Sequence, residues 1–155
     1  PDVISLKKKI FQNMGNYILI AKSITDFTWI DDVSRNKHII IIAEGLLSYF
    51  SRKDAENIIL NLNSHFPGAD FFFQTMSPFV SLSRMKRRDI KFTGVSHKWG
   101  IYSGKILEKL NPKIRFINEW YYSDYSQQRL PFLLRIISWI PLVRKAMKVV
   151  HLRFK

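Results

Sequence analysis

A run of four consecutive isoleucines constrains this chain more than any other feature of its sequence. Residues 39–42 are β-branched and uniformly apolar and Ala43 continues the run, which favours a strand buried on both faces, as in a parallel sheet. An acid, Glu44, follows at once, and then Gly45. Ligands bind outside the carboxyl ends of the strands in an open α/β sheet, so Glu44 is a candidate binding residue.

The residues that follow complete a strand–helix–strand unit. Ser51 stands three residues before Asp54, a spacing typical of a helix start, and apolar side chains then recur at helical spacing until Pro67-Gly68. The next segment, residues 69–75, contains three consecutive phenylalanines and predicts a second buried strand. The predicted fold class is therefore α/β, with two parallel strands joined by a helix.

Weaker patterns cover the rest of the chain, whose 155 residues predict a single domain, 1–155. Near the beginning we expect a helix over 3–13 and a short strand over 17–21. Further along we expect irregular structure over 76–103, helical turns over 105–110, a strand over 114–122, a helix over 130–147 interrupted at Pro141, and a closing strand over 149–154.

Composition and motifs exclude several classes of function. The chain has no cysteine and its four histidines stand at no metal-ligand spacing, so we expect no metal. Its six glycines form no phosphate-binding loop, and no serine lies in a nucleophile elbow. No apolar run approaches the roughly 20 residues of a membrane span, and no basic and apolar leader is present, which predicts a cytoplasmic protein.

Polar side chains follow the predicted strands where ligands bind in this fold class. Asp26 comes shortly after the first predicted strand, and Glu44 follows the isoleucine strand. Thr75 and Ser77 lie at the end of the next strand. Parallel strands bring such residues to one edge of the sheet. A helix cap or loop acid is the more common role for any one of them, but the joint placement of Asp26 and Glu44 favours a site.

Several segments share the pattern of one known family. They are Ser23-Ile24-Thr25-Asp26-Phe27-Thr28-Trp29, Ala43-Glu44-Gly45-Leu46-Leu47-Ser48-Tyr49-Phe50, Phe66-Pro67-Gly68-Ala69, Lys98-Trp99-Gly100-Ile101 and Glu119-Trp120-Tyr121-Tyr122. Together they resemble the leucine carboxyl methyltransferase superfamily, and most of all its branch of tetracenomycin-type polyketide O-methyltransferases. The resemblance covers essentially the whole chain and implies a Rossmann-like, class I, S-adenosylmethionine-dependent methyltransferase sheet.

The resemblance also implies roles for individual residues. In that family the positions matching Asp26 and Phe27 lie by the adenine of S-adenosylmethionine, and the position matching Glu44, with Gly45 beside it, lies near the methionine part. The implied reaction moves a methyl group to a hydroxyl or carboxyl oxygen of a small molecule, chiefly by alignment and exclusion of water. His97 is a candidate general base, although an ordinary loop histidine is the more common case.

The chain departs from the family pattern at its beginning. A complete member carries a first strand, a glycine-rich loop and a second strand before the segment that Pro1-Asp2-Val3-Ile4 resembles. We therefore expect the C-terminal portion of the methyltransferase sheet, lacking the first two strands and the glycine-rich loop. By itself such a chain is expected to bind the cofactor weakly or not at all, and to have impaired or no activity.

Charge supplies a second hypothesis. Lysine and arginine total 25 against 12 acids, and the net charge of +13 favours anionic partners. The basic runs at 7–9 and 84–88 and the basic tail after Asp124, which contains no acid, predict a module that binds RNA or an anionic membrane surface. Solvated basic faces are the alternative, and phosphate binding would be distinguished by its steep loss with added salt.

Overall fold

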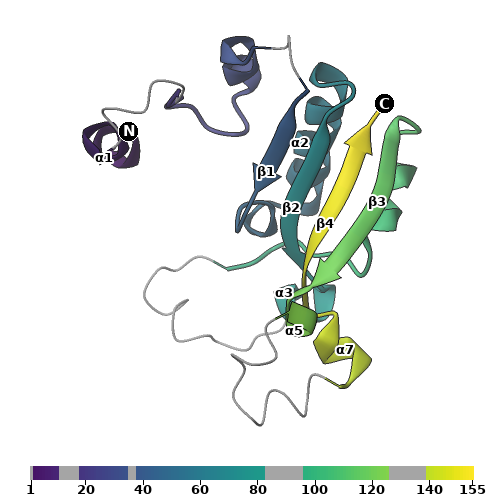
Figure 1. Ribbon diagram of the computed structural model, residues 1–155. Helices are drawn as coiled ribbons and strands as arrows, with labels where there is room; N and C mark the ends of the chain where they lie inside the picture. Colours follow the sequence, from purple (N-terminus) through teal and green to yellow (C-terminus); the bar gives the residue numbers. More distant parts are fainter. Residues whose placement is uncertain (1, 11–17, 35–37, 83–95, 126–138) are drawn as a thin grey trace. The chain divides into compact units, whose positions relative to one another are not determined.

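A computed structural model of the protein describes residues 2–10, 18–34, 38–82, 96–125 and 139–155 (Figure 1). They fall into two compact units, Pro1–Lys37 and His38–Lys155. All four strands of the described residues lie in the second unit. The organisation of the whole chain as one domain stays a prediction.

The described residues of the first unit form two short helices. α1 spans Asp2–Ile10 and confirms the predicted helix up to that point, while residues 11–13 lie outside the described residues. The 3-10 helix η1 spans Phe27–Asp32 and begins after Asp26. A helical turn therefore follows directly on the acid that the sequence places in a binding site.

The strand expected over 17–21 is wrong for residues 18–21, which have no strand conformation. A strand is stabilised by hydrogen bonds to a neighbouring strand, and none of the described strands pairs with these residues. The apolar composition of residues 18–21 is therefore not sufficient to make them a strand.

The second unit is built on one four-stranded sheet with the order β1-β2-β4-β3 (Figure 1). β1 and β2 are parallel, and β4 runs antiparallel to both of its neighbours. The strands are β1 Ile40–Ala43, β2 Asp70–Met76, β3 Ile114–Tyr121 and β4 Met147–Phe154. The α/β fold class is confirmed, and the four corresponding predicted strands form within two residues of their expected ends.

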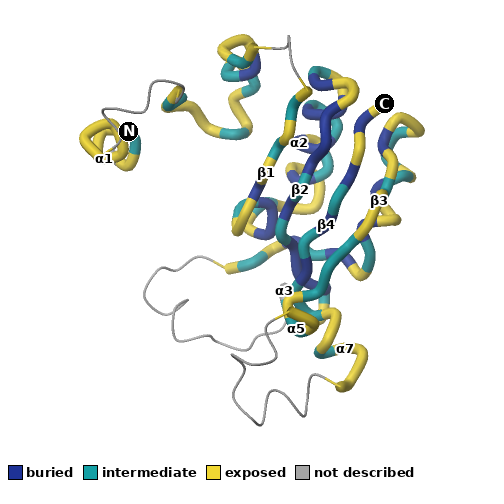
Figure 2. The backbone as a smooth tube through the Cα atoms, viewed as in Figure 1, coloured by how far each residue is buried: buried dark blue, intermediate teal, exposed yellow. Residues whose placement is uncertain are grey.

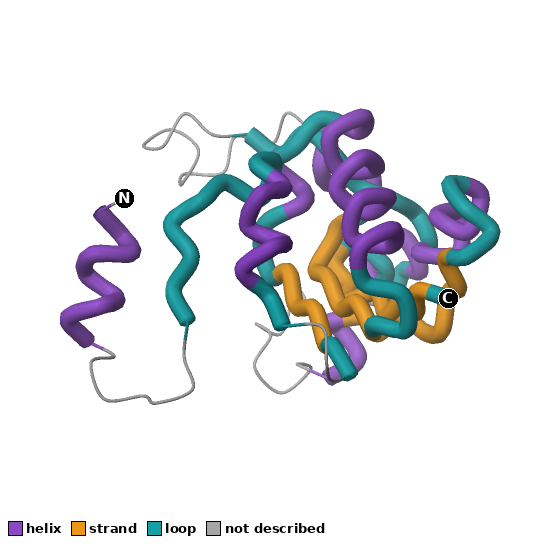
Figure 3. Tube along the Cα trace, turned by 90° about the horizontal axis from the view of Figure 1, so that it is seen from above, coloured by secondary structure: helices purple, strands orange, loops and turns teal. Residues whose placement is uncertain are grey.

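Helix α2, Arg52–His65, joins β1 to β2, and the view from above shows strands packed against helical segments (Figure 3). Its start is fixed by Ser51, whose side chain accepts a hydrogen bond from the backbone N–H of Asp54 at 3.2 Å. Each fully buried large apolar side chain contributes about 1.5–3 kcal/mol to folding. The core between helix and sheet includes Ala55, Ile58, Ile59, Leu62, Phe71, Phe73, Val150 and Leu152 (Figure 2).

The isoleucine strand is not buried on both faces, which corrects that expectation. The side chains of Ile40 and Ile42 are 60% and 75% exposed, whereas Ala43 is buried. Side chains alternate along a strand, so Ile40 and Ile42 share one face. β1 also stands at the edge of the described sheet, where β2 is its single neighbour. In the second unit taken by itself, that face of β1 is left open.

Short helical segments fill several connections. α3 forms within the stretch expected to be irregular, of which residues 83–95 lie outside the described residues. Residues 130–138 of the helix expected over 130–147 also lie outside the described residues. Pro141 begins a helix and does not interrupt one, because proline suits the first helical position. These segments are η2 Leu47–Tyr49, α3 Pro78–Leu82, η3 Gly104–Lys109, α5 Tyr122–Tyr125 and α7 Pro141–Arg144.

A buried carboxylate, Asp70, ties the strands together where β2 begins. Arg153 on β4 donates from Nε and Nη2 to its two oxygens at 2.9 and 2.6 Å. The Nε2 atoms of His151 and His38 lie 2.6 and 2.9 Å from the same carboxylate. The Arg153 guanidinium, with help from both histidines, holds the pKa of Asp70 well below its usual range in spite of burial. The cluster lies at the end of the sheet opposite the carboxyl ends of β1 and β2.

Replacing Asp70 by asparagine should lower the free energy of unfolding at pH 7 by about 2 kcal/mol, because the buried carboxylate that accepts two hydrogen bonds from Arg153 is lost. Because the pKa of Asp70 is lowered in the folded state, its carboxylate stabilises the fold fully at pH values above the unfolded-state pKa of about 3.9. This stabilisation is lost as the pH falls below that value. Urea unfolding of the unsubstituted chain and of Asp70→Asn should therefore show that the difference between their free energies of unfolding is about 1 kcal/mol smaller near pH 3 than at pH 7.

Asp124→Asn is the matched control, because it breaks a more exposed pair, in which Arg144 Nε donates to Asp124 at 2.7 Å. It should cost less than about 1 kcal/mol. Equal losses in the two variants, or an Asp70→Asn difference that stays constant with pH, would contradict the assignment.

Candidate functional site

A cavity of about 200 Å³ lies where the parallel strands β1 and β2 end. Their register sets Ala43 beside Phe73, so the residues after Ala43 and the last residues of β2 surround the same space. This is the edge at which open α/β sheets bind ligands. The residues that line the cavity are Gly45, Ser48, Tyr49, Gln74, Thr75, Met76, His97 and Met147.

Gly45 makes the tight turn that leads out of β1. Its φ of +59° lies in the left-handed region, which favours glycine. Its N–H donates to Oε1 of Gln74 at 2.9 Å, which ties the loop to the end of β2. A Cβ added at Gly45 would meet only that same oxygen, at 3.8 Å. The backbone here is therefore open to close approach by a ligand.

His97 closes the other side of the cavity. Its Nδ1 lies 3.1 Å from Oγ of Ser48, within hydrogen-bonding distance, and its ring stacks on Tyr49 with centroids 4.7 Å apart. The backbone N–H groups of Lys98 and Trp99 both donate to the carbonyl oxygen of Ser48, at 2.7 and 3.1 Å. A distant segment of the chain is thereby held against the loop that follows β1.

Two hydroxyls at the end of β2 are buried without a hydrogen-bond partner among the described residues, Oγ1 of Thr75 and Oγ of Ser77. An unsatisfied buried hydroxyl costs about 1–3 kcal/mol, which a ligand that bonds to it recovers. Thr75 lines the cavity and Ser77 does not. The expectation that strand-end hydroxyls gather at this edge is therefore met by Thr75.

The residues expected to hold a cofactor divide between the two units. Glu44 is exposed and immediately precedes Gly45, which lines the cavity. Asp26 and Phe27 belong to the first unit, and their part in the site stays a prediction. Asp26 accepts hydrogen bonds from the hydroxyl and N–H of Thr28, at 2.7 and 3.2 Å, and these lower its pKa. It therefore caps η1, the more common role that the sequence also allowed.

Sequence reasoning missed five residues of the cavity: Ser48, Tyr49, Gln74, Met76 and Met147. Gln74 did carry a signal, because it is the one amide in a strand of phenylalanines and stands next to Thr75. Met147 could not be found, because the sequence pattern predicts a helix over 130–147. In the structure Met147 lies on β4 and pairs with Met76 on β2.

The described part of the basic tail offers few free cations. Lys148 is fully buried, Arg144 is paired with Asp124, and Arg153 is paired with Asp70. The run at 84–88 lies outside the described residues. Within the described ranges, then, the structure gives no support to a nucleic-acid or membrane surface on this tail.

The described residues contain neither a candidate metal site nor a candidate membrane span. No group of three or more histidine, cysteine, aspartate or glutamate side chains there could hold a metal ion. None of the helices described is long and apolar enough to cross a membrane.

The sequence has a curated relative. The tetracenomycin polyketide synthesis O-methyltransferase TcmP of Streptomyces glaucescens is 30% identical over 120 residues, which are 77% of this chain and 44% of that protein. The resemblance to tetracenomycin-type methyltransferases is confirmed. The chain spans less than half the length of this relative, and no family model matches it.

Solved structures, two of them methyltransferases, share the fold. The N-methyltransferase NodS from Bradyrhizobium japonicum WM9, solved with S-adenosyl-L-homocysteine, gives a TM-score of 0.56 at 10% identity and covers 99% of this chain and 62% of its own. An O-methyltransferase family protein from Burkholderia thailandensis gives a TM-score of 0.53 at 10% identity, and the match covers 99% of this chain and 41% of that protein. A DUF574 family protein from Streptomyces avermitilis gives a TM-score of 0.55 at 11% identity, and the match covers 86% of this chain and 53% of that protein. The chain is thus a homologue of TcmP with a methyltransferase-like fold.

The left-handed turn at Gly45 predicts a ranking of substitutions. Gly45→Ala should lower the free energy of unfolding by about 1 kcal/mol, and Gly45→Asn by less, because asparagine tolerates this conformation better. Gly68→Ala is the control, since Gly68 has a φ of +83° away from the cavity and should lose a similar amount. Urea unfolding measures all three, and an alanine variant as stable as the asparagine variant would contradict the turn.

Proposed function

We propose that this chain carries one side of the active site of an S-adenosylmethionine-dependent O-methyltransferase. The observation that carries the proposal is the cavity beside Gly45, at the carboxyl ends of two parallel strands. The homologue TcmP is named as an O-methyltransferase, and NodS was solved with S-adenosyl-L-homocysteine. Both support a cofactor site at this edge.

The residues at this edge fit the methionine part of such a cofactor. The exposed carboxylate of Glu44 can accept charge-assisted hydrogen bonds from the cofactor ammonium, and Gly45 has no side chain to obstruct it. The buried hydroxyl of Thr75 offers a donor or acceptor that no described residue uses. In the proposal Asp26 and Phe27 contact the adenine, the acid by hydrogen bonding and the ring by stacking.

The cofactor supplies an electrophilic methyl group on its sulfonium. The chain's own contribution is to orient the acceptor oxygen and to keep water away. His97 lines the cavity, and an imidazole there can take the proton that an acceptor hydroxyl releases. Ser48 and Tyr49 fix the ring by the hydrogen bond and the stacking described above. The acceptor we propose is a hydroxyl or carboxyl oxygen of a small organic molecule of the polyketide type.

An amide-resolved NMR titration tests the cofactor site on the chain as it stands. S-adenosylhomocysteine, added to about 10 mM so that a dissociation constant of that order is detected, should shift the amides of Gly45, Gln74 and His97. Amides around Asp70, at the other end of the sheet, should stay in place. The proposal requires binding that is weak but measurable, so shifts that avoid the cavity, or no shifts at all, would overturn it.

A pair of charge-neutralising variants sharpens that titration. Glu44→Gln should weaken the binding by about five-fold, since one exposed charge-assisted hydrogen bond is worth roughly 1 kcal/mol. Asp124→Asn removes the same charge from an acid that does not line the cavity, and it should leave the affinity unchanged. If the two variants behave alike, Glu44 does not contact the cofactor.

A further inference from the structure

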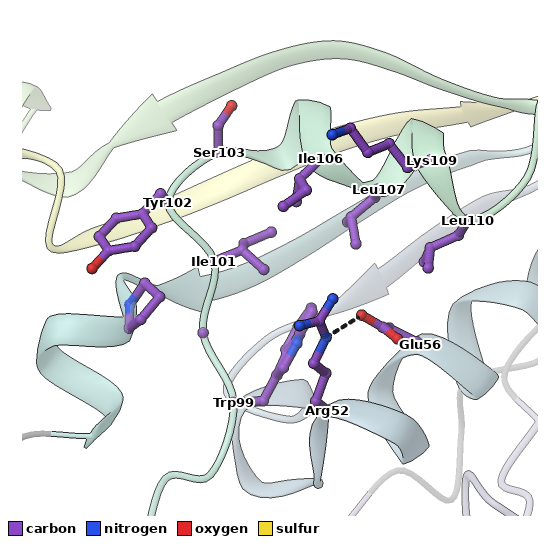
Figure 4. Close-up of a pocket in the computed structure, with 12 residues that line it drawn as sticks. Arg52, Glu56, Trp99, Ile101, Tyr102, Ser103, Ile106, Leu107, Lys109 and Leu110 are labelled. Atoms are coloured by element: carbon purple, nitrogen blue, oxygen red, sulfur yellow. Dashed lines mark hydrogen bonds and ion pairs between the residues drawn. The ribbon is translucent and has the colours of Figure 1, made fainter.

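A second and larger cavity, of about 560 Å³, lies between the first turns of α2 and the 3-10 helix η3. Its volume is within the range of about 300–1,000 Å³ that is usual for small-molecule sites. Figure 4 shows Arg52, Glu56 and Trp99 on one side, Ile106 and Lys109 on the other, and Ile101 on the segment between them. None of Glu44, Gly45 and His97 lines it. It is therefore separate from the proposed cofactor site.

The floor and walls of this cavity are apolar and firmly packed. Trp99, Ile101 and Leu107 are 3%, 7% and 2% exposed, so each presents a small surface that the core holds in place. The N–H of Ile101 donates to the carbonyl oxygen of Met76 at 2.9 Å, which fastens this wall to the end of β2. A flat apolar molecule can cover these surfaces without disturbing the side chains beneath them.

Buried polar groups fix the neighbouring wall. Lys148 donates from Nζ to the carbonyl oxygen of Tyr102, and the same Nζ lies 3.7 Å from Oε2 of Glu119. Glu119 accepts a hydrogen bond from the N–H of Gly104 at 2.9 Å and another from the hydroxyl of Tyr121 at 2.6 Å. Residues 102–104 are thus held by a buried lysine and its carboxylate. A wall held in this way gives a preformed cavity, which lowers the cost of ordering on binding.

The mouth of the cavity carries more positive than negative charge. Nε of Arg52 donates to Oε1 of Glu56 at 2.7 Å, and the two Nη groups of Arg52 have no hydrogen-bond partner among the described residues. Lys109, which is exposed, forms no salt bridge with the described residues and adds a second positive charge. The lining therefore combines an apolar floor with a cationic rim.

We propose that this cavity binds a small apolar carboxylate, with its hydrocarbon part over Trp99 and Ile101 and its carboxylate near Arg52 and Lys109. An aromatic acid fits this description. Apolar contact with the floor and with the exposed side chains of Tyr102 and Ile106 supplies affinity, and the two cations select the anion over a neutral molecule of the same shape. The proposal goes beyond methyl transfer and does not depend on it, because the two cavities have no lining residue in common.

Two probes of the same shape test the selection. Naphthalene-2-carboxylate and the neutral naphthalene-2-methanol are titrated into the chain without any cofactor, and binding is followed by calorimetry and by the indole N–H resonance of Trp99. The carboxylate should bind about ten-fold more tightly than the alcohol and should shift that resonance. No binding by the carboxylate, equal binding of the two probes, or shifts confined to the cavity beside Gly45 would overturn the proposal.

Matched variants locate the cations. The double variant Arg52→Gln and Lys109→Gln should bind the carboxylate about ten-fold more weakly while binding the alcohol as before. The control is Lys53→Gln with Lys105→Gln, since both lysines are exposed and do not line the cavity. Lys53 is next to Arg52 in the sequence, and Lys105 is four residues before Lys109 in η3. An equal loss in the control shows general attraction by a basic protein and overturns the site. Since no cofactor is present, either outcome leaves the methyltransferase proposal to its own test.

Discussion

The parallel pairing of β1 with β2 is the interaction on which the described site depends. A parallel pair needs a crossover, and α2 supplies it while burying its apolar stripe on one face of the sheet. The same pairing brings the residues after Ala43 next to Gln74 and Thr75. Without it, Gly45 and His97 would have no cavity to share, because the hydrogen bond from Gly45 to Gln74 joins the two strand ends.

Among the described residues, paired and unpaired buried polar groups lie at opposite ends of this sheet. At the beginning of β2, Asp70 is fully engaged by one arginine and two histidines. At the end of β2, the hydroxyls of Thr75 and Ser77 are buried with no described partner, and Gly45 is in a conformation that few residues adopt. A sheet fixed at one end can carry unsatisfied groups at the other, where a ligand can satisfy them.

Much of the second unit could be predicted from the sequence, because its signals are local. Four isoleucines, three phenylalanines and the cap at Ser51 each specify an element through nearest-neighbour chemistry. Burial of β1 and pairing of residues 18–21 could not be predicted, because each depends on a neighbouring strand. The same holds for the cavity: Gly45 could be found by its place after a strand, whereas Ser48 and His97 come together only through the fold.

A crystal structure of the chain soaked with S-adenosylhomocysteine tests the central claim most directly. We expect ligand density in the cavity between Gly45 and His97, with the amino acid end of the ligand toward Glu44. Density in the cavity between α2 and η3, or a loop after β1 that no longer meets the end of β2, would contradict it.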